Sequence, residues 1–298
     1  MDRVGFIGIG NMGLGMSKNI LNAGYQLTVY DIKEEALMEL ADLSAQVAKS
    51  PCEVGETSDV VFIMVLNGQQ AKEVVLGNHG LLAGMKPGTT IICTATIMRS
   101  EIIEIGNAAG DQGIHFIDSP VSGGAPGAAA GTLTLMAAAS KDVLDRCMHV
   151  LEAVGQNIYH VGEEIGMGQT VKATLSVLTG VTYAGIFEAL VLGVKAGVKP
   201  EILHQVISTS VVGSFLFRDT TKNIMDRNFT GQSHISTMDK DLGIARNMAK
   251  DCGVPLFTTS VAHELFQVGR IVNPDEDNWT IIKVLEDIVG VEVKKTTS

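Results

Sequence analysis

The sequence lacks several features that mark whole classes of protein. Its four cysteines contain no C-x-x-C pair, so neither the usual zinc spacing nor a small disulfide framework is predicted, and free thiols in a reducing compartment are expected. The seven histidines show no paired ligand spacing, so no metal site is predicted. Glycine is frequent, at 33 of 298 residues, but shows no fixed period, and no repeat or low-complexity segment stands out.

Positive charge is also scarce. Lys and Arg number 22 against 33 Asp and Glu, which gives a formal net charge of -11. Nucleic acids and anionic membranes attract proteins through Lys and Arg, so neither is expected as a partner. The first apolar run starts at Val4 and leaves no room for a signal peptide ahead of it. These features predict a soluble cytoplasmic protein.

One apolar run is long enough to resemble a membrane span. Residues 173–194 carry Glu188 as their single charge, and length alone would allow them to cross a bilayer. Their Ser, Thr and Gly content, and the soluble-looking segments around them, favour a buried helix instead. A helix this apolar is not expected to stand alone, so the sequence predicts a homodimer or homotetramer that shares it.

Strand and helix patterns alternate through the first half of the chain. Strand patterns are predicted at 3–9, 26–31, 59–65, 89–96, 115–120, 131–140 and 156–162. This alternation predicts parallel pairing and a Rossmann-type, doubly wound α/β sheet. After Gly162 helical periodicity takes over. The sequence therefore predicts a dinucleotide-binding domain over 1–163 and an all-helical substrate and oligomerisation domain over 164–298, which begins with a long interdomain helix.

Three glycines near the N-terminus stand in a G-x-G-x-x-G spacing between a predicted strand and a predicted helix. In a dinucleotide site Gly8 would allow the tight turn, and Gly10 would let the backbone approach the pyrophosphate. Gly13 would permit close contact between helix and strand. The alternative is a glycine-rich turn without a ligand.

The residues around this turn add to the prediction. Asn11 and Met12 lie at the start of the helix, where N–H groups and the positive dipole end favour an anion. Asp31 ends the next predicted strand and would accept hydrogen bonds from the adenosine ribose hydroxyls. The same carboxylate would repel a 2′-phosphate, so NAD is favoured over NADP as the cofactor.

Two further segments could carry chemistry. In DSPVSGG, residues 118–124, the hydroxyl of Ser122 and the N–H groups of Gly123 and Gly124 could cradle a carboxylate, or form a plain turn. In GMGQTVK, residues 166–172, Lys172 lies on a helix that then becomes apolar. An apolar wall and a cationic nicotinamide would disfavour its charged form and suit it to proton transfer. The alternative is a lysine that simply reaches solvent.

Four motifs in the same order make the sequence similar to the β-hydroxyacid dehydrogenase family, which includes 3-hydroxyisobutyrate dehydrogenase, tartronate semialdehyde reductase and L-threonate dehydrogenase. They are GFIGIGNMG, DSPVSGG, GMGQTVK and KDLGIA at 240–245. The similarity spans nearly the full length of the chain. Its fold and activity are therefore expected here.

The resemblance implies a role for each matching residue. Gly8, Gly10, Gly13 and Asp31 would hold the dinucleotide, and Thr96 would lie near the nicotinamide. Ser122, Gly123 and Gly124 would bind the substrate carboxylate, with Lys172 as the catalytic acid/base. Lys240 would come from the helical domain towards cofactor and substrate, and Ser214 and Phe215 would lie near the substrate pocket.

The sequence departs from the family at two places. The family usually has an asparagine at the third or fourth residue after the lysine, where this chain has Leu175 and Ser176. Ser176 is shorter but polar, and is expected to contact the substrate. Ala95 replaces the serine of the common D-x-S-T segment. The identity of the substrate is therefore left open.

The sequence thus predicts an oxidoreductase that transfers a hydride between NAD and a small 3-hydroxy acid, 3-hydroxyisobutyrate- or threonate-like, with Lys172 as general acid/base. One alternative is an NADH-dependent reductase of a small semialdehyde acid. Another is a non-catalytic dinucleotide-binding module. Imine reductases resemble the family but typically lack the lysine, so Lys172 disfavours that assignment.

Overall fold

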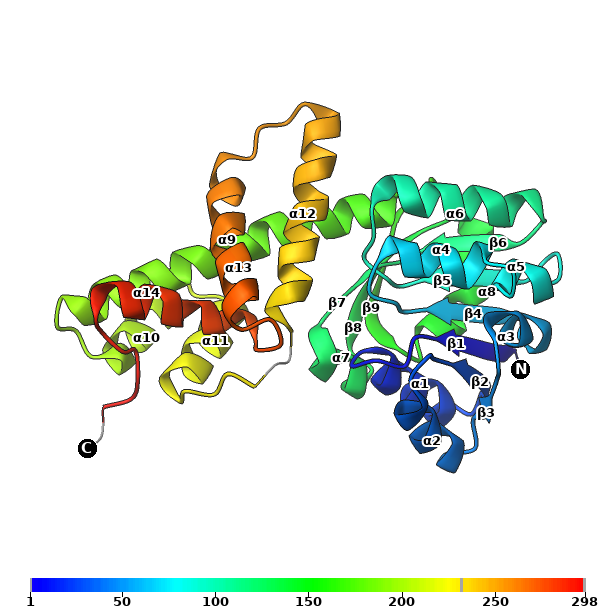
Figure 1. Ribbon diagram of the computed structural model, residues 1–298, viewed down its shortest axis with the longest axis horizontal. Coiled ribbons are helices and arrows are strands. Elements are labelled where there is room, and N and C mark those ends of the chain that lie inside the picture. The colour runs from blue at the N-terminus through cyan, green and yellow to red at the C-terminus, as the bar shows by residue number, and fades with distance from the viewer. Residues whose placement is uncertain (1, 231–232, 297–298) are drawn as a thin grey trace. The chain divides into compact units, whose positions relative to one another are not determined.

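The computed structural model describes residues 2–230 and 233–296, which belong to two compact units divided between Lys172 and Ala173. The first unit is a sheet covered by helices, and the second is all helical (Figure 1). The predicted fold class is confirmed. The domain boundary predicted at 163–164 stays a prediction.

The α/β unit contains strands and helices in alternation. Its strands are β1 (Arg3–Ile7), β2 (Gln26–Tyr30), β3 (Gln46–Val47), β4 (Val60–Ile63), β5 (Thr90–Cys93), β6 (His115–Asp118), β7 (Val121–Ser122), β8 (Leu133–Ala138) and β9 (Gly155–Gly162). Its helices are α1 (Gly13–Asn22), α2 (Glu34–Asp42), α3 (Pro51–Thr57), α4 (Gly68–Leu76), α5 (Leu81–Gly84), α6 (Arg99–Asp111), α7 (Gly124–Ala130) and α8 (Lys141–Leu151). The short elements β3, β7, α3, α5 and α7 were not predicted from the sequence.

The sheet runs in the order β3-β2-β1-β4-β5-β6-β8-β7, with β9 paired to β8. The strands from β3 to β6 are all parallel, in the order of a dinucleotide-binding sheet. The expectation of parallel pairing fails at β8, which is antiparallel to β6 and β7. The reason is local: the chain reverses after β7 through the short helix α7 and Gly131, whose φ is +68°.

The helical unit is built around the long helix α9 (Met167–Lys195), whose first six residues belong to the α/β unit. The other helices are α10 (Pro200–Ser208), α11 (Phe215–Met225), α12 (Ile235–Cys252), α13 (Phe257–Val272), the 3-10 turn η1 (Asn278–Ile281) and α14 (Ile282–Val289). A Cβ at Gly180 would lie 2.8 Å from Leu242 Cδ2. The glycine therefore lets α9 and α12 pack closely.

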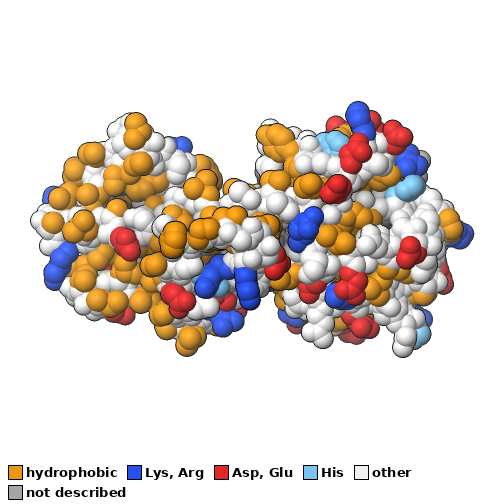
Figure 2. Space-filling view, turned by 90° about the horizontal axis from the view of Figure 1, so that it is seen from above, with side chains coloured by type: hydrophobic (Ala, Val, Ile, Leu, Met, Phe, Trp, Pro, Cys, Tyr) orange, Lys and Arg blue, Asp and Glu red, His pale blue; other side chains and the backbone are white. Residues whose placement is uncertain are grey.

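The surface of the helical unit is rich in hydrophobic side chains (Figure 2). Leu178 and Leu192 of α9 are exposed, as are Phe257 and Val261 of α13. Helix α9 is, by length and composition, apolar enough to cross a membrane, but the core helix of a soluble protein passes the same test. Phe187 and Leu190 of this helix are fully buried inside the helical unit.

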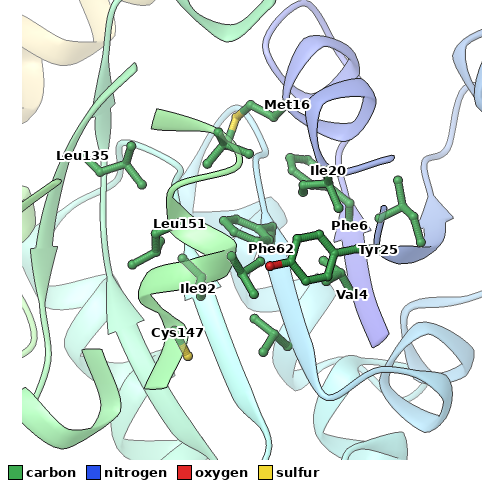
Figure 3. Packing of buried hydrophobic residues seen from close by; sticks show 14 of the residues in the cluster. Val4, Phe6, Met16, Ile20, Tyr25, Phe62, Ile92, Leu135, Cys147 and Leu151 are labelled. Atoms are coloured by element: carbon green, nitrogen blue, oxygen red, sulfur yellow. The ribbon is translucent and has the colours of Figure 1, made fainter. Parts of the chain in front are cut away.

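The central strands β1, β4 and β5 are buried on both faces, which explains why they read as continuous apolar runs. Phe6 of β1 stacks on Phe62 of β4, with ring centroids 5.6 Å apart, and Met16 and Ile20 of α1 cover the same face (Figure 3). Ile7, the next residue of β1, belongs to the core of the opposite face. Strands β1, β4, β5 and β6 pair in parallel, so their carboxyl ends lie along the same edge of the sheet.

Candidate active site

The glycine turn connects β1 to α1 at this edge. Gly8 has φ of +96°, and a Cβ there would lie 2.2 Å from Met64 O. A Cβ at Gly13 would lie 1.9 Å from Gly8 O. Neither position can hold a side chain, because backbone atoms occupy the space. At Gly10, which is exposed, a Cβ would meet nothing within 4 Å, so this backbone is accessible to a ligand.

Helix α1 begins beside Gly10 without a side-chain cap. Leu14 N–H donates to Gly10 O at 3.0 Å, and Met12 is the N-cap residue with helical backbone angles. Asn11 is exposed and Met12 is half-buried. The positive end of the helix dipole therefore lies at the turn, as pyrophosphate binding requires.

Asp31 follows β2 and lies against the turn. Its Oδ2 accepts a hydrogen bond from Ile9 N–H at 2.6 Å, and its Oδ1 accepts one from Lys33 N–H at 2.9 Å. These bonds hold the half-buried carboxylate at the end of β2, next to β1. The glycine cradle and this carboxylate fit a dinucleotide with a free ribose diol.

The helix after the turn also contacts the next loop of the site. A Cβ at Gly15 would lie 2.8 Å from the carbonyl carbon of Ala128 in α7. Asn19 Nδ2 donates to Ala128 O at 2.7 Å. Helices α1 and α7 therefore pack backbone to backbone.

Helix α7 follows the predicted substrate-carboxylate site, residues 122–124, called here the carboxylate loop. Ser122 is half-buried and pairs with Thr134 of β8. Gly123 and Gly124 follow with φ of +131° and +62°, angles that L side chains rarely adopt. The loop therefore needs glycine for its backbone conformation as well as for access.

Lys172 reaches this loop from 51 residues away in the sequence. Its Nζ donates to Val121 O at 3.0 Å. The residue is half-buried on the first turns of α9. The structure therefore brings the predicted acid/base within one residue of Ser122.

Two residues that the sequence reasoning left without a role hold this arrangement. Asp118 Oδ2 accepts hydrogen bonds from the N–H groups of Gly166 at 2.9 Å and Gln169 at 3.2 Å. Gln169 Nε2 donates to Asp118 Oδ1 at 2.9 Å and to Ala95 O at 3.0 Å, while its Oε1 accepts from Ile97 N–H at 3.0 Å. The available signal was a glutamine and an aspartate inside otherwise apolar elements.

The Thr96 segment is therefore tied to the start of α9. Thr96 is half-buried between Ala95 and Ile97, whose backbone groups both bond Gln169. Ala95, where the family has a serine, contributes its carbonyl and is fully buried. Residues 94–97, 118–124 and 166–172 thus meet at the carboxyl ends of β5 and β6.

Burial dominates the electrostatics beneath these segments. It raises the pKa of the Asp118 carboxyl, although hydrogen bonds from Gln169 and the start of α9 oppose the shift. Burial, together with the negative charge of Asp118, raises the pKa of the Cys93 thiol to about 12. Cys93 therefore stays neutral in the fold. Among the described residues no cluster of His, Cys, Asp or Glu could hold a metal ion.

The remaining predicted residues lie in the helical unit. Ser176 is one turn beyond Lys172 on α9 and is buried. Ser214 caps α11 by accepting from Phe217 N–H at 3.1 Å, and Phe215 is 78% exposed. Lys240 of α12 pairs with Asp241 Oδ1 at 3.1 Å. Their roles at the site stay predictions.

Comparison with known proteins identifies the family. Residues 3–162 match the NAD binding domain of 6-phosphogluconate dehydrogenase, and residues 166–285 match the NAD-binding domain of NADP-dependent 3-hydroxyisobutyrate dehydrogenase. The chain is 36% identical over 293 residues to 2-(hydroxymethyl)glutarate dehydrogenase of Eubacterium barkeri, covering 98% of this chain and 97% of that one. The chain belongs to the β-hydroxyacid dehydrogenase family.

Other members of the β-hydroxyacid dehydrogenase family are similar over the same length. L-threonate dehydrogenase of Cupriavidus necator is 33% identical, with 96% of each chain covered. The solved structure of Mycobacterium tuberculosis 3-hydroxyisobutyrate dehydrogenase with L-serine matches with a TM-score of 0.89 at 28% identity, covering 96% of this chain and 99% of that chain. The resemblance found in the sequence is confirmed, and the chain is an oxidoreductase with a nicotinamide dinucleotide site.

Proposed function

We propose that this enzyme transfers a hydride reversibly between NAD and a small 3-hydroxy acid, with Lys172 as general acid/base. The observation that carries the proposal is the 3.0 Å hydrogen bond from Lys172 Nζ to Val121 O. It holds the amine next to Ser122 and the two glycines that follow. A carboxylate on those N–H groups would bring a hydroxyl a few bonds away to the amine.

Groups of this chain bind and orient the substrate and transfer one proton. The N–H groups of Gly123 and Gly124 and the hydroxyl of Ser122 hold the substrate carboxylate. In oxidation Lys172 takes the hydroxyl proton as the hydride leaves the carbinol carbon, and in reduction it returns the proton to the oxygen. The bound nicotinamide supplies the redox chemistry by accepting or returning the hydride.

The cofactor preference rests on Asp31. Gly8, Gly10, Asn11, Met12 and Gly13 form the pyrophosphate turn in this proposal, and Asp31 bonds the ribose diol. The carboxylate disfavours a 2′-phosphate, so NAD is preferred over NADP.

The substrates after which the relatives are named support the substrate class. 2-(Hydroxymethyl)glutarate, L-threonate and 3-hydroxyisobutyrate are all hydroxy acids. Thr96 and Lys240 would contact the cofactor, and Ser176, Ser214 and Phe215 would contact the substrate. Reduction of a small semialdehyde acid is the same chemistry in the reverse direction.

We also propose a cellular compartment and an oligomeric state for the enzyme. The cysteines among the described residues are free thiols, which suits a reducing cytoplasm. The exposed hydrophobic side chains of the helical unit suit a homodimer or homotetramer.

Substitution of Lys172 tests the proposal. A panel of small 3-hydroxy acids, each with NAD and with NADP, is followed by absorbance of the reduced cofactor. Lys172→Ala should lower kcat by about 10² or more while NADH binding is retained, because proton transfer of this kind contributes about 10²–10⁴. Lys86→Ala, at an exposed lysine, is the matched control.

Three results would contradict the proposal in different ways. Near-wild-type turnover of Lys172→Ala would remove Lys172 from the reaction. No turnover by the wild type with any acid or semialdehyde, despite NADH binding, would favour a non-catalytic dinucleotide-binding module. Equal turnover with NADP would remove the role of Asp31 in cofactor choice.

A further inference from the structure

The start of α9 lies unusually close to the sheet. A Cβ at Gly168 would be 2.6 Å from Asp118 O and 2.7 Å from Met136 O. No other residue type fits there without a shift of backbone. The first turn of the helix that carries Lys172 therefore packs directly on the end of β6 and on β8.

Asp118 acts as the cap of this helix from a distant strand. Its carboxylate is fully buried and accepts from the N–H groups of Gly166 and Gln169, 48 and 51 residues away. The N-terminal N–H groups of a helix otherwise lack partners, and a negative charge there is favoured by the dipole. The cap therefore fixes the start of α9 against β6.

Gln169 connects the helix to a second segment. Its amide uses both of its ends: Nε2 donates to Asp118 Oδ1 and Ala95 O, and Oε1 accepts from Ile97 N–H. Two of these partners, Ala95 and Ile97, are the residues on either side of Thr96. One buried side chain therefore sets the distance between the Thr96 segment, β6 and α9.

A further hydrogen bond links the same helix back to the segment that contains Asp118. Lys172, one turn after Gln169, returns to the sheet by donating to Val121 O. Val121 is three residues after Asp118 in the same segment. The amine and the carboxylate loop thus have a common support in the Asp118–Gln169 pair.

We propose that Asp118 and Gln169 are positioning residues of the reaction, which set Lys172 and Thr96 relative to the carboxylate loop. The proposal rests on the proposed function for the roles of Lys172 and Thr96. Neither residue touches substrate in it. Their contribution is the alignment of groups that do, where an error of about 1 Å can cost about 10² in rate.

Two substitutions of Gln169 test this role. Gln169→Met keeps the volume but loses every hydrogen bond of the amide. Gln169→Glu keeps the acceptor for Ile97 N–H and loses the donor towards Asp118 and Ala95 O. Gln112→Met, at an exposed glutamine at the end of α6, is the matched control.

The expected result is a fall in kcat by about 10–10² in both variants at pH 8. The Kd for NADH should stay close to that of wild type, while the unfolding temperature, measured on the same preparations, should fall because buried partners of the amide lose a hydrogen bond. A fold-wide role would weaken NADH binding, and so raise its Kd, together with the fall in kcat. Unchanged kcat in a folded Gln169→Met protein would overturn the proposal.

The pH dependence of Gln169→Glu separates positioning from simple loss of packing. Asp118 on β6 is the titratable group bonded to Gln169, and Lys172 lies one turn further along α9. Cys93 on β5 is coupled electrostatically to Asp118, and Arg99 on α6 packs against Gly166. A glutamate beside Asp118 is protonated more readily, and its protonated form donates again. The ratio of wild-type kcat to variant kcat should therefore decrease as the pH is lowered from 8 to 6. A constant ratio would overturn the proposal even if Gln169→Met does not fold.

A readout without cofactor or substrate completes the test. Acetic anhydride modifies free lysine amines, and mass spectrometry compares Lys172 with exposed Lys86 in one sample. Loss of the Gln169 bonds should raise the relative rate at Lys172 by about threefold or more, because the first turns of α9 open more often. An unchanged rate would overturn the proposal. This measurement still decides it if the wild type turns over no hydroxy acid, in which case the proposed function alone fails.

Discussion

At the scale of single residues, the glycines of the N-terminal turn serve different purposes. Gly13 is required by packing, because a Cβ would lie 1.9 Å from a backbone oxygen. Gly10 has open space at the same position, although both belong to one motif. A shared motif therefore combines a residue needed for the fold with one needed for ligand access.

This difference predicts opposite outcomes for the same substitution. Gly13→Ala should lower the free energy of unfolding by about 3 kcal/mol or more, because the backbone must move to admit the methyl group. Gly10→Ala should unfold like wild type but raise the Kd for NADH about tenfold, which corresponds to about 1.4 kcal/mol. Thermal unfolding and NADH fluorescence titration measure the two effects. Equal loss of stability in both variants would contradict the assignment.

At the scale of elements, parallel strands are joined at their amino ends as well. Arg3 opens β1 and pairs with Asp59, the residue before β4, through Nη2 to Oδ1 at 2.7 Å and Nε to Oδ2 at 3.2 Å. Arg3 N–H also donates to Asp59 Oδ2 at 3.0 Å. The guanidinium bonds are the largest cause of a lowered pKa of the Asp59 carboxyl. The pair therefore ties two neighbouring central strands where they begin.

The substitution Asp59→Asn should show at which pH the Arg3–Asp59 pair stabilises the fold. Because the pKa is lowered in the fold, the stabilisation is complete above the ordinary carboxyl pKa of 3.8 and is lost as pH falls through the lowered value. The pair is largely exposed, so the variant should lose about 0.5–1 kcal/mol at pH 7. Denaturant unfolding from pH 7 to pH 3 should show this difference shrinking below about pH 4. Asp145→Asn, in the exposed Lys141–Asp145 pair within α8, serves as a control with a smaller effect.

At the scale of the whole molecule, the helical unit exposes several large apolar side chains. Phe257 and Val261 of α13 are 80% and 70% exposed, and they line a groove with Val181 and Ala184 of α9. Hydrophobic side chains extend over this unit (Figure 2). Exposed apolar patches of this kind mark association surfaces.

Assembly through this groove predicts a mass change on one substitution. The wild type should elute as a dimer or tetramer at micromolar concentration, and Val261→Glu should shift it towards the monomer by placing a charge in the interface. Met38→Glu changes an equally exposed apolar residue of α2 and should leave the mass unchanged. Light scattering on the eluted protein measures each mass. A monomeric wild type would contradict the proposal.

Much of this architecture could be predicted from local pattern. The strands leading into the glycine turn, Asp31 and DSPVSGG show as apolar runs, and motif spacing placed the site at their ends. The direction of β8 could not be predicted, because it depends on the reversal through α7 rather than on β8 itself. The roles of Asp118 and Gln169 could not be predicted either, because their hydrogen-bond partners lie 48 to 74 residues away in the sequence. Periodicity does not report such distances.

The packing of α1 on α7 has a thermodynamic consequence. In the proposed function a dinucleotide contacts the start of α1, and Gly15 and Asn19 of that helix pack against the backbone of Ala128 in α7. Helix α7 starts at the carboxylate loop, so both ligands rest on one pair of helices. We therefore expect their affinities to be linked. By reciprocity, the factor by which coenzyme tightens the hydroxy acid equals the factor by which the acid tightens the coenzyme.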